Sequence, residues 1–146
     1  MTANSEQDAI LEMLIACRTI AVVGLSPKPH RASYDVSQYM QRAGFRIMPV
    51  NPNAREVLGE RAYASLSGAA KAERIDLANV FRNSEDVPPV IDEAMAIGAK
   101  AVWLQLGVVH EAAAARARAA GLLVVQDRCL KIEHARLQAR GLLGDH

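Results

Sequence analysis

Two kinds of apolar pattern alternate along the chain. Short runs of consecutive apolar residues, typical of buried strands, occur at residues 19–23, 45–50, 75–81, 100–107 and 122–127. The segments between these runs carry apolar residues every three or four positions, which predicts helices at residues 5–16, 33–43, 84–97, 110–120 and 129–139. Residues 57–67 follow neither period, and we expect them to be irregular.

Helix-boundary residues support these assignments. Ser33 and Ser84 stand at the expected helix starts, where a serine hydroxyl commonly caps the first turn. Gly44, Gly98 and Gly121 follow the expected helix ends, where glycine is favoured because it adopts the left-handed conformation at little cost.

Strands that are apolar throughout must be buried on both faces, and strands separated by helices pair in parallel. We therefore expect an α/β fold with three layers, a Rossmann-like fold in which a five-stranded parallel sheet carries helices on both faces. A length of 146 residues suits one domain over residues 1–146. In such folds ligands bind at the carboxyl ends of the strands.

The loop after the first strand contains the candidate anion-binding residues. Gly24 ends the strand, and Ser26, Lys28, Arg31 and Ser33 lead into the next helix. Unpaired amides and the dipole at a helix start favour anions, and the bases add charge, so this loop could hold a pyrophosphate. The alternative is a solvated loop with capping serines and surface bases.

The same loop lacks the pattern of a redox dinucleotide site. Of three spaced glycines only Gly24 is present, with Ser26 and Pro29 at the other two positions. The second strand ends in Asn51 rather than the carboxylate that binds a ribose diol. Arg55 nearby suits a nucleotide whose ribose carries an extra phosphate. No glycine-lysine-hydroxyl run typical of ATP sites occurs.

Charge and composition exclude several classes of protein. A net charge of +1 argues against a general nucleic-acid binder. No apolar run reaches the roughly 18 residues of a membrane span, and the N-terminus lacks the features of a signal peptide. Cys17 and Cys129 are too few for a disulfide framework, and no metal-ligand spacing is present. We therefore expect a cytoplasmic protein without a metal, a membrane partner or a nucleic-acid partner.

The ordered motifs VVGLSPKPHRAS, PVNPN, NVFR, VWLQLGV and DRCLKIEH resemble those of the small bacterial and archaeal CoA-binding proteins. These are stand-alone Rossmann-type domains similar to the N-terminal domain of the succinyl-CoA synthetase alpha subunit. The resemblance covers residues ~10–138. It implies binding of coenzyme A (CoA) or an acyl-CoA, with no acyl-CoA formation, because the synthetases need a second domain and a partner subunit. We expect a monomer or a homodimer.

The resemblance also implies a role for each strand-end loop. Gly24, Ser26 and Lys28 would hold the CoA pyrophosphate, assisted by Arg31 and Ser33. Val50, Asn51 and Pro52 would lie along the adenosine, and either Arg55 or Arg82 would bind the 3′-phosphate. The remaining implied cofactor contacts are Phe81, Gln105, Gly107 and Cys129, with Gln105 and Gly107 beside the pantetheine arm.

Three alternatives remain open from the sequence. The chain could be a small enzyme that uses an NAD(P)-type nucleotide. It could be a CoA-linked thiol redox carrier, because Cys129 is expected near a helix N-terminus, which favours the thiolate. It could also be an interaction subunit that has lost ligand binding.

Overall fold

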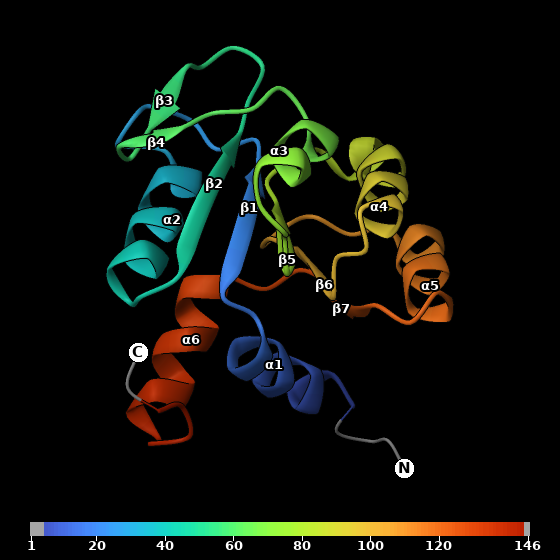
Figure 1. The fold of residues 1–146 in the computed structure, drawn as a ribbon. Helices are drawn as coiled ribbons and strands as arrows, with labels where there is room; N and C mark the ends of the chain where they lie inside the picture. The colour runs from blue at the N-terminus through green and yellow to red at the C-terminus, as the bar shows by residue number, and fades with distance from the viewer. Residues whose placement is uncertain (1–4, 145–146) are drawn as a thin grey trace.

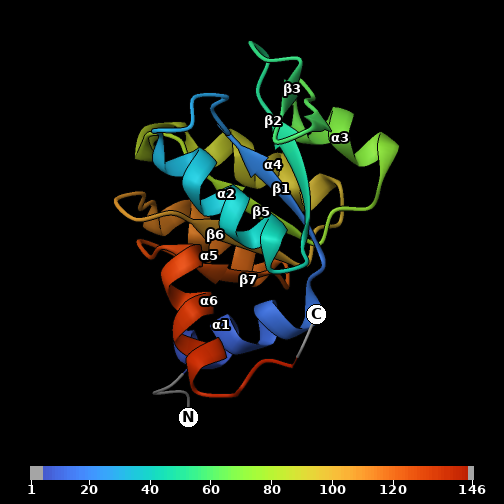
Figure 2. The same cartoon turned by 90° about the vertical axis from the view of Figure 1, so that its left-hand side faces the viewer.

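A central parallel sheet lies between two layers of helices in the computed structural model, which describes residues 5–144 (Figures 1 and 2). The sheet order is β2-β1-β5-β6-β7, and every neighbouring pair is parallel. The strands are β1 (Thr19–Val23), β2 (Arg46–Val50), β5 (Leu77–Val80), β6 (Ala101–Leu104) and β7 (Leu123–Val125). The predicted five-stranded parallel sheet is therefore confirmed.

The helices divide evenly between the two faces of the sheet (Figure 1). One face is covered by α1 (Ser5–Ala16), α2 (Ala32–Arg42) and α6 (Leu130–Ala139). The other is covered by α3 (Leu66–Ala72), α4 (Val87–Ala96) and α5 (Glu111–Ala119). Each layer closes its own apolar core, so the three-layer α/β expectation is confirmed.

The winding of the sheet reverses at β1. The chain leaves β1 through α2 to reach β2 on one side, and it later reaches β5 on the other side of β1. Ligands in open α/β sheets bind outside the carboxyl ends of the strands at such a reversal. The residues that follow β1 and β5, Gly24 and Phe81, are therefore at the position where a site is expected.

The prediction that residues 57–67 are irregular is wrong. They contribute to an antiparallel hairpin of β3 (Glu56–Val57) and β4 (Glu60–Arg61). Strands of two residues are too short to show a period. The hairpin turn consists of Leu58 and Gly59 with φ of 56° and 76°, and tight hairpin turns of this kind normally carry Asn-Gly. Leucine at the first position hid the signal.

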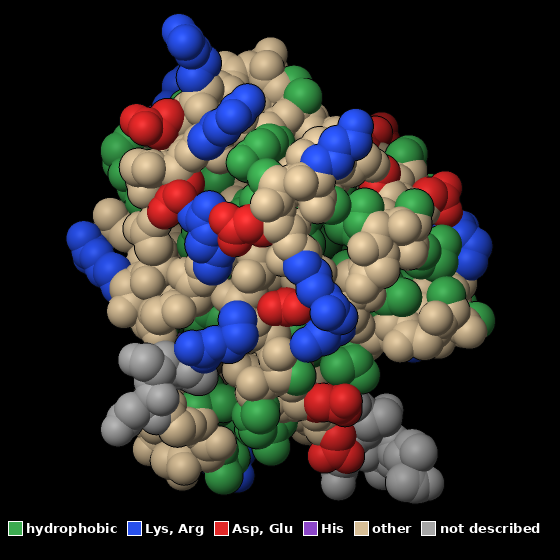
Figure 3. All heavy atoms as spheres, viewed as in Figure 1, with side chains coloured by type: hydrophobic (Ala, Val, Ile, Leu, Met, Phe, Trp, Pro, Cys, Tyr) green, Lys and Arg blue, Asp and Glu red, His purple; other side chains and the backbone are tan. Residues whose placement is uncertain are grey.

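Helix α3 was also missed, and it begins within the same stretch. Ser65 caps it by accepting a hydrogen bond from the Gly68 amide at 3.0 Å. The helix has only seven residues, which is too short to reveal a helical period. Arg46 joins this region to the sheet through ion pairs with Glu60 and Glu73. On the side of the molecule seen in Figure 1, Lys and Arg side chains lie beside Asp and Glu side chains (Figure 3).

Neither predicted serine cap is present. Helix α2 begins at Ala32 after Arg31, and the Ser33 hydroxyl instead accepts a hydrogen bond from the Ser26 amide at 3.0 Å. Ser84 begins a 3₁₀ turn before α4, and its hydroxyl accepts from the Val109 amide at 2.9 Å. Both serines connect loops at the carboxyl edge of the sheet, a role that helix-boundary rules do not predict.

Candidate functional site

Two clefts open side by side at the carboxyl edge of the sheet. The first, the β1 cleft, measures about 690 Å³ and is lined by Gly24, Ser26, Arg31, Ala32, Ser33, Asn51, Pro52, Asn53, Phe81 and Arg82. The second, the β6 cleft, measures about 640 Å³ and is lined by Ala32, Asp35, Val36, Phe81, Arg82, Asn83, Asp86, Gln105, Leu106, Val108, Cys129 and Ile132. Ala32, Phe81 and Arg82 line both clefts. We call the two clefts together the trough; it lies where the winding of the sheet reverses at β1.

Ten of the fourteen residues predicted from the sequence line this trough. The structure therefore brings together most of the residues that the motifs suggested, although they come from loops far apart in the chain. The four that line neither cleft are Lys28, Val50, Arg55 and Gly107.

The amides of the first loop are largely used within the fold. Gly24 donates to the Val50 carbonyl at 2.9 Å, and Ser26 donates to the Ser33 hydroxyl at 3.0 Å. Lys28 donates to the Ser26 hydroxyl at 3.1 Å, and Arg31 to the Lys28 carbonyl at 3.0 Å. These bonds fix the shape of the loop, so its glycine bend offers few donors to an anion.

Gly24 is explained by the packing of two loops. Its φ is +90°, and a Cβ atom there would lie 2.3 Å from the backbone oxygen of Phe81. No other residue fits without moving the loop after β5. The glycine is thus required by the close approach of the β1 and β5 loops, whether or not a ligand is bound.

Free amide donors lie at the start of α2. The first helical hydrogen bond runs from the Asp35 amide to the Arg31 carbonyl at 3.1 Å. No described residue accepts from the amides of Ala32, Ser33 or Tyr34, as expected for the first turn of a helix. Their partial positive charge faces the junction of the two clefts, which Ala32 lines on both sides.

Basic side chains surround this helix start. Arg31 and Arg82 are exposed, line the β1 cleft, and form no ion pair with residues 5–144. Lys28 is exposed on the same loop but lies outside both clefts. Amide donors and unpaired guanidinium groups together make a site suited to a phosphate or pyrophosphate.

The loop after β2 supports the first loop. The Asn51 side chain donates from Nδ2 to the Leu25 carbonyl at 3.0 Å, and its Oδ1 accepts from the Asn53 amide at 2.8 Å. Val50 is 2% exposed and packs in the core, so only its carbonyl reaches the first loop. Of this segment, Pro52 and Asn53 offer exposed surface to the β1 cleft.

Arg55 lies apart from the trough. It lines a separate hollow of about 710 Å³ beside the β3–β4 hairpin, together with Arg61. The Arg61 guanidinium stands 5.4 Å from the centre of the Tyr63 ring. The hollow therefore carries two arginines next to the loop that contains Asn51.

A buried amide and a partly exposed thiol line the β6 cleft. Gln105 is 5% exposed; its Oε1 accepts from the Leu130 amide at 3.4 Å, while no residue of the described chain pairs with its Nε2. Cys129 is partly exposed and immediately precedes α6, as predicted. The adjacent Arg128 guanidinium turns away, toward Glu6 at 2.9 Å.

Gly107 shapes the turn beside this cleft. It has φ +86° and open space around the position of a Cβ atom. Its amide donates to Asp127 Oδ1 at 2.8 Å, which connects the loops that follow β6 and β7. Gly107 therefore has a structural role at the edge of the cleft.

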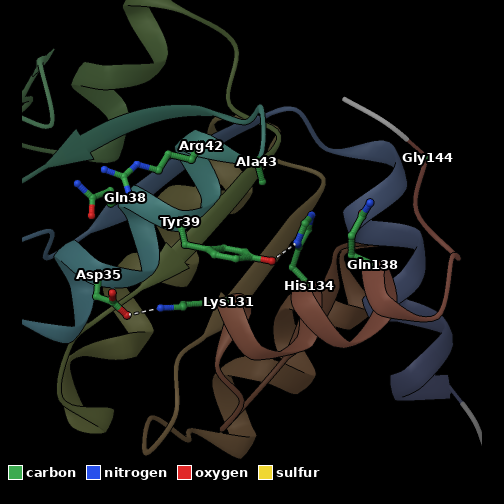
Figure 4. A pocket seen from close by; sticks show the side chains of 9 residues that line it. All are labelled: Asp35, Gln38, Tyr39, Arg42, Ala43, Lys131, His134, Gln138 and Gly144. Carbon is green, nitrogen blue, oxygen red and sulfur yellow. Dashed lines mark hydrogen bonds and ion pairs between the residues drawn. The ribbon is translucent and has the colours of Figure 1, made fainter.

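Another hollow, of about 630 Å³, lies along the sides of α2 and α6 (Figure 4). The Tyr39 hydroxyl points to His134 Nδ1 at 2.9 Å, and Lys131 pairs with Asp35 at 2.9 Å. These side chains bind one another across the two helices, and of the residues that line the hollow only Asp35 also lines the trough. We therefore assign the candidate site to the trough.

Sequence reasoning missed several lining groups. The Ala32 and Tyr34 amides could not be assigned because the helix start was placed at Ser33. Leu106 and Ile132 are 64% and 50% exposed, although apolar residues are normally expected in the core. Leu106 lies near the end of the segment 100–107, which was predicted to be one buried strand. The sequence pattern does not show that the strand ends at Leu104 and that Leu106 is exposed.

Two other kinds of site are absent from the described residues. Among the helices of residues 5–144, none combines the length and the apolar character that a bilayer span requires. Within the same residues, no three His, Cys, Asp or Glu side chains gather as a metal site would need.

Comparison with known proteins adds independent information. The family described as CoA binding domain matches residues 18–135. YneT of Bacillus subtilis, described as uncharacterized, is 42% identical over 132 residues, which cover 90% of this chain and 96% of YneT. A hypothetical protein from Pyrococcus horikoshii OT3 has a TM-score of 0.85 at 35% identity, covering 91% of this chain and 92% of that chain. A Thermus thermophilus protein has a TM-score of 0.80 at 37% identity, covering 92% and 98%.

Proposed function

The chain belongs to the CoA binding domain family, and from this premise we propose that it binds CoA in the trough at the carboxyl edge of its sheet. The observation that carries the proposal is the start of α2. The amides of residues 32–34 have no acceptor among the described residues, and Arg31 and Arg82, which form no ion pair with residues 5–144, line the same cleft as Ala32 and Ser33. We assign the pyrophosphate to this position.

In this proposal, each cleft holds a different part of the rest of the cofactor. The β1 cleft, with the exposed Pro52 and Asn53, would receive the adenosine. We assign the 3′-phosphate to the neighbouring hollow that Arg55 and Arg61 line, which supports Arg55 rather than Arg82 for this role. The β6 cleft would receive the pantetheine arm, with its end near Cys129.

Calorimetric titration with CoA tests the assignment of the pyrophosphate. Arg82→Ala should weaken CoA about tenfold, because a hydrogen bond to a charged group contributes about 1.5–3 kcal/mol and this one is partly exposed. The matched control is Arg74→Ala, an exposed arginine before β5 at the opposite edge of the sheet. Equal affinities of the two variants would contradict the assignment.

Dephospho-CoA tests the assignment of the 3′-phosphate. Arg55→Ala should weaken CoA but leave the affinity for dephospho-CoA unchanged, since only CoA carries the phosphate that Arg55 would bind. A parallel loss for both ligands would show that Arg55 acts elsewhere.

The position of Asn51 argues against a redox dinucleotide enzyme. Its side-chain amide is already bonded to the Leu25 carbonyl and the Asn53 amide, and it carries no negative charge, so it is a poor substitute for the carboxylate that binds a ribose diol in such enzymes. CoA should therefore raise the melting temperature more than NAD or NADP at equal concentration, by mass action. A larger shift from NAD or NADP would favour the enzyme instead.

We also propose that binding involves no phosphotransfer. His110 Nδ1 accepts from the Ala113 amide at the start of α5, and His134 lies in the hollow between α2 and α6. Neither histidine lines the trough. We further propose that the protein is cytoplasmic, because both cysteines are free thiols, as a reducing compartment allows. For its oligomeric state we propose a monomer or a homodimer.

A second candidate function rests on Cys129, which is partly exposed and lines the β6 cleft. Its thiolate could attack CoA disulfide, forming a Cys129–CoA disulfide and releasing one CoA thiolate, so the step needs no other oxidant. Intact-mass measurement after incubation with CoA disulfide should show one added CoA. Persistence of that mass in Cys129→Ser would refute the assignment to this thiol.

A further inference from the structure

Exposed apolar side chains gather at the rim of the β6 cleft. Of the five large apolar side chains that are exposed among the described residues, Leu106 and Ile132, 64% and 50% exposed, belong to this cleft, and Val109, 37% exposed, is close to it in the chain. Leu106 and Ile132 line the cleft directly, and Val109 follows the lining residue Val108. Water against such a cluster is unfavourable, so a ligand that covers it gains affinity.

Gln105 brings a buried side-chain amide to the β6 cleft. Gln105 is only 5% exposed, and its Nε2 donates no hydrogen bond to any of residues 5–144. A donor in this position suits a neutral carbonyl oxygen. A cleft of about 640 Å³ in which apolar side chains stand beside a few polar ones has the character of a small-molecule site.

Charged side chains at the cleft set a further limit. Asp35 and Asp86 line it, and Asp35 is paired with Lys131 at 2.9 Å. Arg82 also lines it, on the side shared with the β1 cleft, where we assign the pyrophosphate. A carboxylate on a ligand in the β6 cleft would therefore meet two acidic side chains, with Arg82 occupied by phosphate.

We propose that the β6 cleft selects acyl-CoA thioesters with a short, neutral, aliphatic acyl group. The acyl chain lies against Leu106 and Ile132, and the thioester carbonyl accepts from Gln105 Nε2. This inference rests on the proposed binding of CoA in the trough, which places the thiol end of the cofactor at Cys129.

Calorimetric titrations with CoA, acetyl-CoA, butyryl-CoA and succinyl-CoA test the selectivity. Each buried methylene should tighten binding about fourfold, so butyryl-CoA should bind about 5- to 15-fold tighter than acetyl-CoA, the lower value allowing for partial exposure. Succinyl-CoA, which carries a carboxylate, should bind at least tenfold more weakly than butyryl-CoA. Equal affinities for all four ligands would overturn the inference.

Variants locate the selectivity. Leu106→Ser and Ile132→Ser should each weaken butyryl-CoA more than acetyl-CoA or free CoA, which reduces the butyryl-to-acetyl ratio to below about threefold. Ile15→Ser on α1, at a residue 58% exposed, is the matched control and should leave the ratio intact. Gln105→Leu should weaken acyl-CoAs relative to CoA.

The outcomes separate this inference from the proposal on which it rests. Binding of CoA without any preference among acyl groups would overturn the acyl site alone. Failure of CoA and of every acyl-CoA to bind would overturn the proposed function, whatever the cleft variants do. Because Leu106 and Ile132 are exposed, their serine variants should fold, which a thermal melt of each variant verifies.

Discussion

Replacement of Gly24 by alanine should destabilise the protein far more than the same change at Gly107. Both glycines have positive φ, +90° and +86°. They differ in their surroundings: a Cβ at position 24 would lie 2.3 Å from the Phe81 oxygen, whereas position 107 has nothing within 4 Å. The pair therefore separates the cost of backbone conformation from the cost of crowding.

The magnitudes follow from these surroundings. A left-handed conformation costs an L-residue about 1–2 kcal/mol, and both variants bear this cost. Gly24→Ala must also move the Phe81 carbonyl by about 1 Å, and overpacking of this kind costs about 1–3 kcal/mol. The Phe81 amide donates to the Val23 carbonyl at 2.9 Å, which restrains that movement. We expect a loss of about 2–5 kcal/mol for Gly24→Ala and about 1–2 kcal/mol for Gly107→Ala.

Urea denaturation of the wild type and both variants, followed by far-UV circular dichroism, measures these losses. The midpoint should fall for both variants, and the fall should be larger for Gly24→Ala at an unchanged slope. Losses of equal size would refute the conclusion that Gly24 is required by contact with the β5 loop. Such a result would instead favour the alternative that a glycine is needed here so that the backbone can approach a ligand closely.

Three further predictions concern residues outside the trough. Burial raises the pKa of the Cys17 thiol to about 12, so iodoacetamide at pH 8 should label Cys129 in the native protein and Cys17 only after unfolding, as peptide mass mapping would show; early labelling of Cys17 would contradict its burial. Burial would raise the pKa of Asp76, but hydrogen bonds from the Arg18 and Thr19 amides and the charge of Lys100 keep it below the usual range. This carboxylate therefore stabilises the fold above pH ~4 and loses its effect as the pH falls toward its folded pKa; Asp76→Asn should cost about 1–3 kcal/mol at pH 7 in urea titrations, and the difference from wild type should close in acid. Asn79 is 1% exposed, and neither amide atom has a partner among the described residues; Asn79→Leu should raise the unfolding free energy by about 1 kcal/mol or more, and a clear loss of stability would show that the amide is satisfied.

Periodicity was sufficient to predict the five strands of the parallel sheet and five of the six α-helices that lie within residues 5–144. Strands buried on both faces are apolar throughout, as in β1 and β6, and helices with one buried face alternate visibly. The β3–β4 hairpin and α3 escaped because each is shorter than the window in which a period can be recognised. Their positions depend on tertiary contacts, among them the bond from Gln41 Nε2 to the Leu58 carbonyl at 3.1 Å.

The candidate site was predicted as a set of loops but not as a set of donors. The rule that ligands bind at strand ends identified the loops that contain Gly24, Phe81 and Gln105. It could not show that the amides of the glycine bend are already hydrogen-bonded within the protein, because their acceptors, on Val50 and Ser33, belong to other parts of the chain. Nor could an apolar run show that Leu106 projects into solvent.

The claim on which the proposed function depends is that CoA phosphates bind the free amides at the start of α2. A titration of ¹⁵N-labelled protein with CoA, followed by amide chemical shifts, tests it residue by residue. The amides of Ala32, Ser33 and Tyr34 should show the largest shifts, while those of Arg74 and Lys100 at the opposite edge of the sheet stay unchanged. Saturable CoA binding that leaves residues 32–34 unshifted would contradict the claim.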